Sequence, residues 1–218
     1  LVGETGGKDY IFAHKSAHVD ALVASIIRGA FEYQGQKCSA ASRAYIPRSI
    51  WPEVKEKLIK EIKTIKVGDV EDFSNFMGAV INQKAFKTIK DYINYAKESY
   101  EAEIIIGGNC DDSIGYFIEP TVIVTKNPYF KTMVEEIFGP VITIFVYDDI
   151  DFEKTIKICE RTSPYGLTGA IFARDRYIIA KLEEELIHTA GNFYINDKPT
   201  GAVVGQQPFG GSRASGTN

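Results

Sequence analysis

The stretch PVITIFVYDDIDFEKTIKICERTSPYGLTGAIFA, residues 140–173, decides the fold class of this chain. It contains two short apolar runs with an amphipathic segment between them. Residues 140–147 predict a buried strand, residues 151–162 predict a helix, and residues 167–173 predict a second buried strand. A helix between two buried strands is typical of a parallel sheet, because parallel strands need a long connection.

The same alternation of strands and helices continues outward in both directions. Ser16 is the predicted N-cap of a helix whose apolar positions recur at helical spacing from Val19 to Phe31. This helix is expected to end near Gly35, and Ser49 is the predicted cap of the next helix. The remaining predicted elements are strands at residues 43–47, 103–108, 116–124 and 191–196 and helices at residues 86–99 and 176–187.

The predicted fold class is therefore α/β, with a twisted, mainly parallel sheet that is flanked by helices. The 218 residues contain no internal repeat and no linker, so residues 1–218 are expected to form one domain. The first residue is not Met, and both ends of the sequence are loop-like. The sequence is therefore expected to be a piece of a longer protein.

Charge and composition argue against several kinds of partner. The net charge is −4, and no Lys/Arg cluster with interleaved aromatic residues occurs, so neither nucleic acid nor an anionic membrane is the expected partner. The most apolar run, residues 137–147, is shorter than the roughly 20 residues that span a bilayer. The cysteines and histidines show no spacing typical of a zinc site, so no metal is expected. A small molecule is the expected substrate.

One cysteine lies in a context that suits a nucleophile. Cys38 follows the predicted helix end in FEYQGQKCSAAS, residues 31–42. Free backbone amides beside the thiol favour a thiolate, and the small residues after it leave space for a substrate. A packed, structural cysteine is the alternative. Cys110, in an exposed turn, and Cys159, on the apolar face of a helix, are expected to be structural.

The first residues contain a glycine-rich motif, GETGGKD, residues 3–9. It is not a phosphate-binding loop, because Asp9 follows Lys8 where such a loop has Ser or Thr, and no GxGxxG occurs in the chain. The glycines instead allow Glu4 to end a strand and to point into a cleft. A solvated glutamate before a turn is the alternative.

Two later segments carry polar groups that suit ligand binding. In EEIFGPV, residues 135–141, an acidic pair precedes a buried strand, and a carboxylate there can accept hydrogen bonds from ribose hydroxyls. Glu135 and Glu136 are equally well explained as charges at the end of a helix. Residues 194–216 are glycine-rich, and their amides can form a nest for a carboxylate. A flexible tail is the alternative there.

Taken in order along the chain, the four motifs resemble those of the aldehyde dehydrogenase superfamily from the first residue to the last. Within it, GETGGKD, RGAFEYQGQKCSA, TSPYGLTGAIFARD and AGNFYINDKPTGAVVGQQPFGGSRASGTN resemble the Δ1-pyrroline-5-carboxylate dehydrogenase family. The resemblance implies that the chain is the thiol-bearing catalytic domain of an NAD-dependent aldehyde dehydrogenase.

The resemblance also implies roles for individual residues. Cys38 matches the nucleophile, which forms a thiohemiacetal and then a thioester, and its backbone amide matches half of the oxyanion hole. Glu4 matches the general base that activates water. Glu136 matches the residue that holds the nicotinamide ribose of NAD, and Phe138 matches the residue that packs beside the nicotinamide.

The implied substrate is L-glutamate γ-semialdehyde, which is oxidised to L-glutamate in proline catabolism. Ser39, Gly201 and Ala202 match the anchors of the substrate carboxylate, and Phe209 matches the aromatic residue that lines its chain. Another aldehyde, or a truncated non-catalytic assembly module, is the alternative. A cofactor-free thiol hydrolase is less favoured, because the three histidines, His14, His18 and His188, show no partner pattern.

The resemblance implies that parts of the whole enzyme have no counterpart in this sequence. The N-terminal dinucleotide-binding domain and the extreme C-terminus match nothing here. We therefore expect NAD to be bound mainly by that other domain, and residues 1–218 alone to have negligible activity. The full-length parent is expected to be a homodimer or a higher homo-oligomer, in the mitochondrial matrix if it is eukaryotic and otherwise in the cytoplasm.

Overall fold

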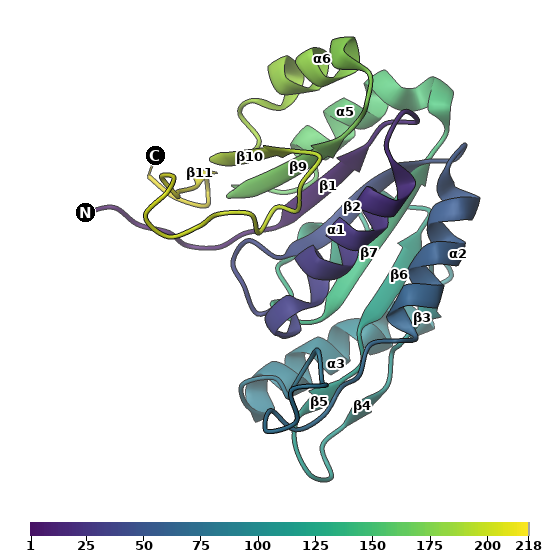
Figure 1. The fold of residues 1–218 in the computed structure, drawn as a ribbon, viewed down its shortest axis with the longest axis vertical. Helices are drawn as coiled ribbons and strands as arrows, with labels where there is room; N and C mark the ends of the chain where they lie inside the picture. The colour runs from purple at the N-terminus through teal and green to yellow at the C-terminus, as the bar shows by residue number, and fades with distance from the viewer. Residues whose placement is uncertain (218) are drawn as a thin grey trace.

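A computed structural model describes residues 1–217, and its centre is one seven-stranded sheet (Figure 1). Five neighbouring pairs of strands are parallel, and only the pair at one edge is antiparallel. The predicted mainly parallel sheet is confirmed. From one edge to the other, the strands are β10 (Asn192–Ile195), β9 (Thr168–Phe172), β1 (Asp9–Ala13), β2 (Ala41–Pro47), β7 (Val141–Tyr147), β6 (Thr121–Thr125) and β3 (Ala102–Ile106).

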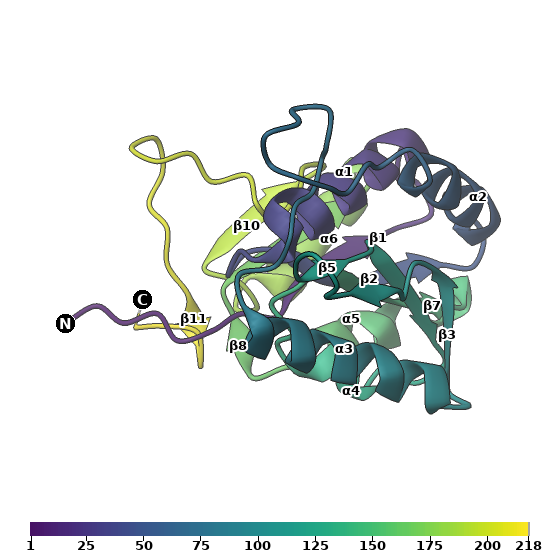
Figure 2. The same cartoon turned by 90° about the horizontal axis from the view of Figure 1, so that it is seen from below.

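Helices cover both faces of the sheet, which makes three layers (Figure 2). One face is covered by α1 (Val19–Phe31) and α2 (Trp51–Ile62). The other face is covered by α3 (Gln83–Glu98), α4 (Lys131–Val134), α5 (Phe152–Arg161) and α6 (Arg176–Leu186). Because side chains alternate along a strand, each central strand contributes to two separate apolar cores. On β1, for example, Tyr10 packs in one core and Ile11 in the other.

The stretch that decides the fold class forms β7, α5 and β9, as predicted. β9 does not pair with β7, because β2 and β1 lie between them in the sheet. The connection therefore crosses two strands, and α5 packs its Ile156 and Cys159 against the sheet on the way.

Two predicted helix caps are wrong. α1 begins after His18, whose Nδ1 accepts a hydrogen bond from the amide of Ala21. The hydroxyl of Ser16 instead accepts hydrogen bonds from amides near residue 174. α2 begins after Ile50, and the Ser49 hydroxyl donates to Asp149 at 2.5 Å. In both cases the serine side chain bonds to a residue distant in sequence instead of capping the helix as the local rule predicts.

The end of the first helix is correctly predicted near Gly35. After α1 the chain makes a distorted turn, η1 (Glu32–Gly35), in which Tyr33, Gln34 and Gly35 all have positive φ. Gly35, at φ 63°, lies so close to another loop that a Cβ there would be 2.3 Å from the carbonyl oxygen of Gly139. This turn redirects the chain toward Cys38.

Short elements complete the fold. β11 (Ser212–Arg213) pairs with β8 (Tyr165–Gly166), β4 (Cys110–Asp111) pairs with β5 (Phe117–Ile118), and η2 (Asp149–Asp151) precedes α5. Cys110 was predicted in an exposed turn but is half-buried at the start of β4. Asn218, the last residue of the predicted domain, lies outside the described residues.

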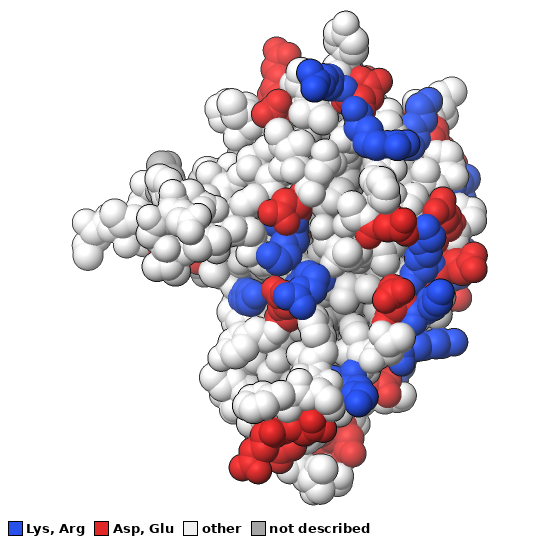
Figure 3. All heavy atoms as spheres, in the orientation of Figure 1, with Lys and Arg blue, Asp and Glu red and all other residues white. Residues whose placement is uncertain are grey.

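The two ends of the described chain run side by side and project from the body (Figures 1 and 2). The amide of Thr5 donates to the carbonyl of Ser215 at 3.0 Å, and Glu4 forms an antiparallel bridge with Gly216. This projection is largely uncharged, whereas the body carries mixed acidic and basic side chains on the face in view (Figure 3). None of the helices in residues 1–217 has the length and apolar character that crossing a membrane requires.

Candidate active site

The predicted catalytic and cofactor-binding residues come from three loops at one edge of the sheet. Glu4 lies in the segment before β1, Cys38 in the turn before β2, and Glu136 and Phe138 in the segment before β7. β1, β2 and β7 are consecutive parallel neighbours, so their amino ends lie at the same edge. The topology therefore brings together residues that are far apart in the sequence.

Glycines let these loops touch through their backbones. A Cβ on Gly7 would lie 2.4 Å from the carbonyl oxygen of Cys38, and one on Gly35 would lie equally close to the loop of Gly139. Real Cβ atoms do not approach a carbonyl oxygen this closely. The glycines that the sequence placed beside Glu4 and Cys38 are therefore required for packing of the three loops.

Cys38 occupies the tip of a tight turn in which the amide of Ala40 donates to the carbonyl of Lys37 at 3.0 Å. Its thiol is half-buried in a small cleft. The cleft is lined by Gly7, Asp9, Gly35, Lys37, Cys38, Ala40, Ser42, Glu136, Ile137, Phe138 and Gly139. Three of the four predicted segments thus meet around the candidate nucleophile.

The two residues of the acidic pair, Glu135 and Glu136, form hydrogen bonds in different places. Glu136 accepts a hydrogen bond from the amide of Gly7 at 2.8 Å, so it faces the cleft. Glu135 turns away and accepts a hydrogen bond from the Tyr92 hydroxyl at 2.6 Å. Phe138 has a φ of 60°, which is an unfavourable backbone conformation for a bulky residue. The residue is 45% exposed, so it presents its ring to the solvent side.

The charges around Cys38 oppose its ionisation. Burial raises the pKa of the thiol to about 11, and the nearby carboxylates of Glu4 and Asp9 add to the shift. The amide of Ser39 acts in the opposite direction. The Ser39 amide favours a thiolate, as predicted for nearby amides, but burial and the two carboxylates outweigh it, so the net shift of the thiol pKa is upward.

The remaining predicted substrate residues lie at varied distances from this cleft. Ser39 is next to Cys38 on the same turn, and its carbonyl accepts a hydrogen bond from Thr168. Gly201 packs against the ring of Tyr194, where a Cβ would be 2.8 Å away. Ala202 is half-buried and Phe209 is 40% exposed, both in the long loop between β10 and β11 (Figure 1). In the part of the chain that the structure describes, Gly201, Ala202 and Phe209 do not line the cleft of Cys38.

Three buried charged residues behind the cleft were missed from the sequence. Lys8, Asp9 and Arg43 are each 2% exposed. Burial lowers the pKa of Lys8 to about 7, and its Nζ has no hydrogen-bond partner within residues 1–217. Lys8 and Asp9 were considered only as parts of a phosphate loop. Their position at the start of the apolar strand YIFA was the available signal that they are buried.

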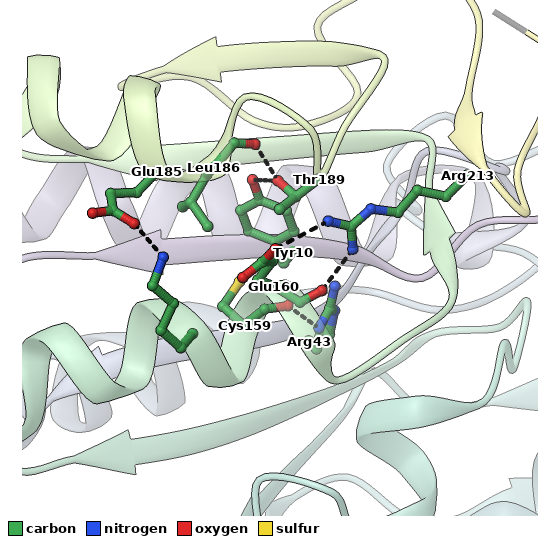
Figure 4. Close-up of polar contacts among 9 residues, drawn as sticks. Tyr10, Arg43, Cys159, Glu160, Glu185, Leu186, Thr189 and Arg213 are labelled. Carbon is green, nitrogen blue, oxygen red and sulfur yellow. Dashed lines mark hydrogen bonds and ion pairs between the residues drawn. The ribbon is translucent and has the colours of Figure 1, made fainter.

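Arg43 connects three elements from inside the molecule. Its Nε donates to the carbonyl of Lys8 at 2.8 Å, and its Nη1 donates to the Tyr45 hydroxyl at 2.9 Å and to the carbonyl of Cys159 at 3.1 Å. Arg213 donates to the carbonyl of Glu160 at 2.6 Å, so two arginines cap the last turn of α5 (Figure 4). These contacts satisfy carbonyls that a helix end leaves free.

The other cysteines have surroundings of a structural kind. Cys159 is fully buried on α5, close to Tyr10 and Arg43 (Figure 4), and burial raises its pKa to about 12. Burial also raises the pKa of the half-buried Cys110. Residues 1–217 contain no cluster of three or more His, Cys, Asp or Glu side chains that could hold a metal ion.

The candidate site combines a cysteine turn, a glutamate and a second acidic loop at the amino edge of a parallel α/β sheet. These features define the class of protein, and the chain belongs to the aldehyde dehydrogenase family. The family model described as "Aldehyde dehydrogenase family" matches residues 1–218. The predicted superfamily is confirmed.

Two relatives show which members of the family this chain is similar to. The chain is 61% identical over 218 residues to "Delta-1-pyrroline-5-carboxylate dehydrogenase, mitochondrial" of Dictyostelium discoideum and 51% identical over 219 residues to the Homo sapiens protein of that name. All of this chain matches in both cases, but it spans only 39% of each relative.

The fold of the chain matches solved enzymes of the family. It superimposes on the Delta-pyrroline-5-carboxylate dehydrogenase from Mycobacterium tuberculosis bound with NAD with a TM-score of 0.92, at 48% identity, covering 100% of this chain and 39% of that one. Betaine aldehyde dehydrogenase from Staphylococcus aureus in complex with NAD⁺ gives a TM-score of 0.89 at 32% identity, covering 99% of this chain and 42% of that one.

Proposed function

We propose that residues 1–218 are the thiol-bearing catalytic domain of an NAD-dependent Δ1-pyrroline-5-carboxylate dehydrogenase, which oxidises L-glutamate γ-semialdehyde to L-glutamate in proline catabolism. The observation that carries the proposal is the placement of Glu4 and Cys38 on separate loops at one sheet edge, where the Glu4 carboxylate raises the pKa of the thiol. The high identity to relatives of that name supports the choice of aldehyde.

Cys38 is the proposed nucleophile and Glu4 the proposed base. The thiol proton passes to the Glu4 carboxylate and on to solvent while sulfur bonds to the aldehyde carbon, which gives a thiohemiacetal on Cys38. The backbone amide of Cys38 donates to the oxygen that becomes negative. After oxidation to a thioester, Glu4 takes a proton from water, water oxygen bonds to the acyl carbon, and the carbon–sulfur bond breaks. This step releases the carboxylic acid and restores Cys38.

Glu136 and Phe138 fit the nicotinamide end of NAD. The Gly7 amide fixes one oxygen of Glu136, and the other accepts no hydrogen bond from residues 1–217, so it is free to accept one from a ribose hydroxyl. The exposed ring of Phe138 offers a flat apolar surface beside it. NAD, when bound, supplies the hydride acceptor for the oxidation. We assign most of its contacts to a further domain, since the relatives extend well beyond the matched region.

The substrate anchors are Ser39, Gly201 and Ala202 for the α-carboxylate and Phe209 for the carbon chain. The support is the position of Ser39 beside the nucleophile and the glycine-rich loop that holds the half-buried Gly201 and Ala202. The parent protein is a homodimer or higher homo-oligomer. We place it in the mitochondrial matrix if it is eukaryotic, which the printed names of the eukaryotic relatives support, and otherwise in the cytoplasm.

The test is NADH production by the full-length protein that contains these residues, with Δ1-pyrroline-5-carboxylate and with betaine aldehyde as alternative substrates. We expect preference for the former. Cys38→Ala should abolish oxidation, and Glu4→Gln should slow turnover by about 10²–10⁴-fold while a thioester on Cys38 accumulates. Equal or greater activity with betaine aldehyde favours a different aldehyde. Absence of any oxidation, with a stable oligomer, favours the assembly module.

A further inference from the structure

Asp9 is a third carboxyl group of the cleft, and nothing in the proposed chemistry uses it. It is the first residue of β1, it is 2% exposed, and its side chain lines the same cleft as Cys38 and Glu136. Within residues 1–217 it forms no ion pair. An isolated buried carboxylate is costly unless it is neutral or well bonded, so its presence here requires an explanation.

The two oxygens of Asp9 have different surroundings. Oδ1 accepts a hydrogen bond from the amide of Thr168 at 2.5 Å, whereas Oδ2 accepts none from residues 1–217. Oδ2 lies 2.7 Å from the point where a Cβ on Gly7 would stand, and the carbonyl oxygen of Cys38 lies 2.4 Å from the same point. The free oxygen of Asp9 and the backbone of the nucleophile therefore flank the same glycine.

The groups around Asp9 compensate its charge only in part. Burial raises the pKa of Asp9 to about 7, and Glu136 adds to the shift, while the Thr168 amide and Arg43 oppose it. Arg43 itself is directed to the carbonyls of Lys8 and Cys159 and to Tyr45, so it does not bond Asp9. Lys8, next in sequence, attracts the Asp9 charge, but its buried Nζ forms no hydrogen bond within residues 1–217.

We propose that Asp9 is a positioning residue that controls the ionisation of Cys38: neutral, it permits the thiolate beside it, and charged, it opposes that thiolate. The inference deepens the proposed function, on which the catalytic meaning of Cys38 rests. Two negative charges in one partly buried cleft disfavour each other, and the effect is reciprocal, so each group resists the ionisation of the other. The nucleophile therefore forms most readily while Asp9 holds its proton.

The test measures alkylation of Cys38 by iodoacetamide as a function of pH, from about pH 6 to about pH 11, on the full-length protein that contains these residues. Peptide mapping separates Cys38 from Cys110 and Cys159. Asp9→Asn removes the charge but keeps an oxygen for the Thr168 amide. Asp112→Asn, an exposed aspartate of the β4–β5 hairpin, is the matched control.

We expect Asp9→Asn to lower the apparent pKa of alkylation and to raise the rate near pH 8 by about 3–10-fold, with no change in Asp112→Asn. An unchanged profile in a folded Asp9→Asn protein overturns the inference, because a merely structural aspartate alters stability and not thiol ionisation. Asp9→Ser, which is also uncharged, carries the same expectation if Asp9→Asn does not fold.

A measurement on the unsubstituted chain provides an independent check. The infrared carbonyl band of a protonated carboxylic acid should disappear between about pH 6 and about pH 8 and be absent from Asp9→Asn. A chain without this band overturns the inference. Alkylation needs neither aldehyde nor NAD, so a shifted profile in a protein that oxidises no aldehyde refutes the proposed function alone.

Discussion

Cys38 is held as a neutral thiol by its surroundings. The half-buried sulfur shares its cleft with the carboxyl groups of Asp9 and Glu136. The exposed Glu4 and the buried Asp9 raise the pKa of the thiol, and the Ser39 amide lowers it. A resting thiol of this kind is protected from unwanted reaction, and it becomes a nucleophile when a base removes its proton at the moment of attack. The placement of Glu4 beside the sulfur suits that role.

Asp9 should make the stability of the folded chain depend on pH. Its pKa is raised by burial from an ordinary value of 3.8 to about 7, so between these values the folded state holds a proton that the unfolded state has lost. The contribution of Asp9 is complete below about pH 3.8 and is lost as the pH rises to about 7. The difference in unfolding free energy between the unsubstituted chain and Asp9→Asn should fall by up to about 1.4 kcal/mol per pH unit across that window.

Urea unfolding of both proteins at several pH values between about 5 and 8 measures this difference. Lys8, with a pKa lowered to about 7, adds a rise in stability above pH 7. In Asp9→Asn this rise should begin at lower pH, because the Asp9 charge raises the pKa of Lys8, and it adds to the fall in the difference. A difference that stays constant over the whole range contradicts the burial of an ionisable Asp9.

At the scale of elements, glycines and one arginine join the pieces that carry the site. Gly7 and Gly35 bring the loops into backbone contact, and Arg43 bonds the carbonyl before β1 to the end of α5. None of these residues is a proposed catalytic group. They set the distances between the groups that are proposed to be catalytic.

Gly35→Ala should be far more harmful than Gly205→Ala, its matched control. Both glycines have positive φ, of 63° and 79°, which costs a residue with a Cβ about 1–2 kcal/mol. Only at Gly35 would the new Cβ also strike backbone, the carbonyl of Gly139, whereas nothing lies within 4 Å at Gly205. We expect a loss of about 3 kcal/mol or more against about 1 kcal/mol, measured by urea unfolding. Equal losses show that the loop contact is unimportant.

Arg43→Lys should also destabilise the fold although it keeps the charge. A lysine cannot reproduce the planar fork that bonds Lys8, Tyr45 and Cys159 together. Losing one or two buried charge-assisted bonds should cost about 2–4 kcal/mol in urea unfolding. Arg176→Lys, at an exposed position on α6, is the control and should change stability by less than about 0.5 kcal/mol. A similar effect of the two changes contradicts the bridging role of Arg43.

At the scale of the whole molecule, the site lies at the amino edge of a parallel sheet. Ligands of open α/β sheets usually bind at the carboxyl edge. Here the carboxyl ends of β2 and β7 are followed by contacts between residues distant in sequence, such as those of Ser49 with Asp149. The amino edge is where the three glycine-rich loops meet and where the projecting ends of the described chain begin.

Residues 1–218 alone should bind NAD weakly. They supply Glu136 and Phe138 for the nicotinamide end and no glycine fingerprint for the pyrophosphate. Titration calorimetry with the 218-residue chain should show no saturation at concentrations that saturate the full-length protein. Cys38 should still react with iodoacetamide at alkaline pH in the same preparation, which controls for folding of the site. Tight binding by the short chain would falsify the assignment of NAD to another domain.

Much of this molecule could be predicted from local patterns. The periodicity of apolar residues predicted β7, α5 and β9, and the order of four motifs predicted the family and placed Glu4, Cys38 and Glu136 on loops. These predictions succeed because backbone geometry and apolar burial act on neighbouring residues. The helix caps at Ser16 and Ser49 failed because their partners, near residues 174 and 149, are distant in sequence.

The sequence by itself thus determined which elements form, in which order, and which thiol and carboxylates are the candidates for the chemistry. Only the tertiary structure decided how these groups behave. It placed Glu136 against the Gly7 amide and Glu135 against Tyr92, buried Lys8, Asp9 and Arg43, and raised the pKa of Cys38. The physical reason is that the free energy of a charge depends on its burial and on every charge nearby, and those distances exist only after the chain has folded.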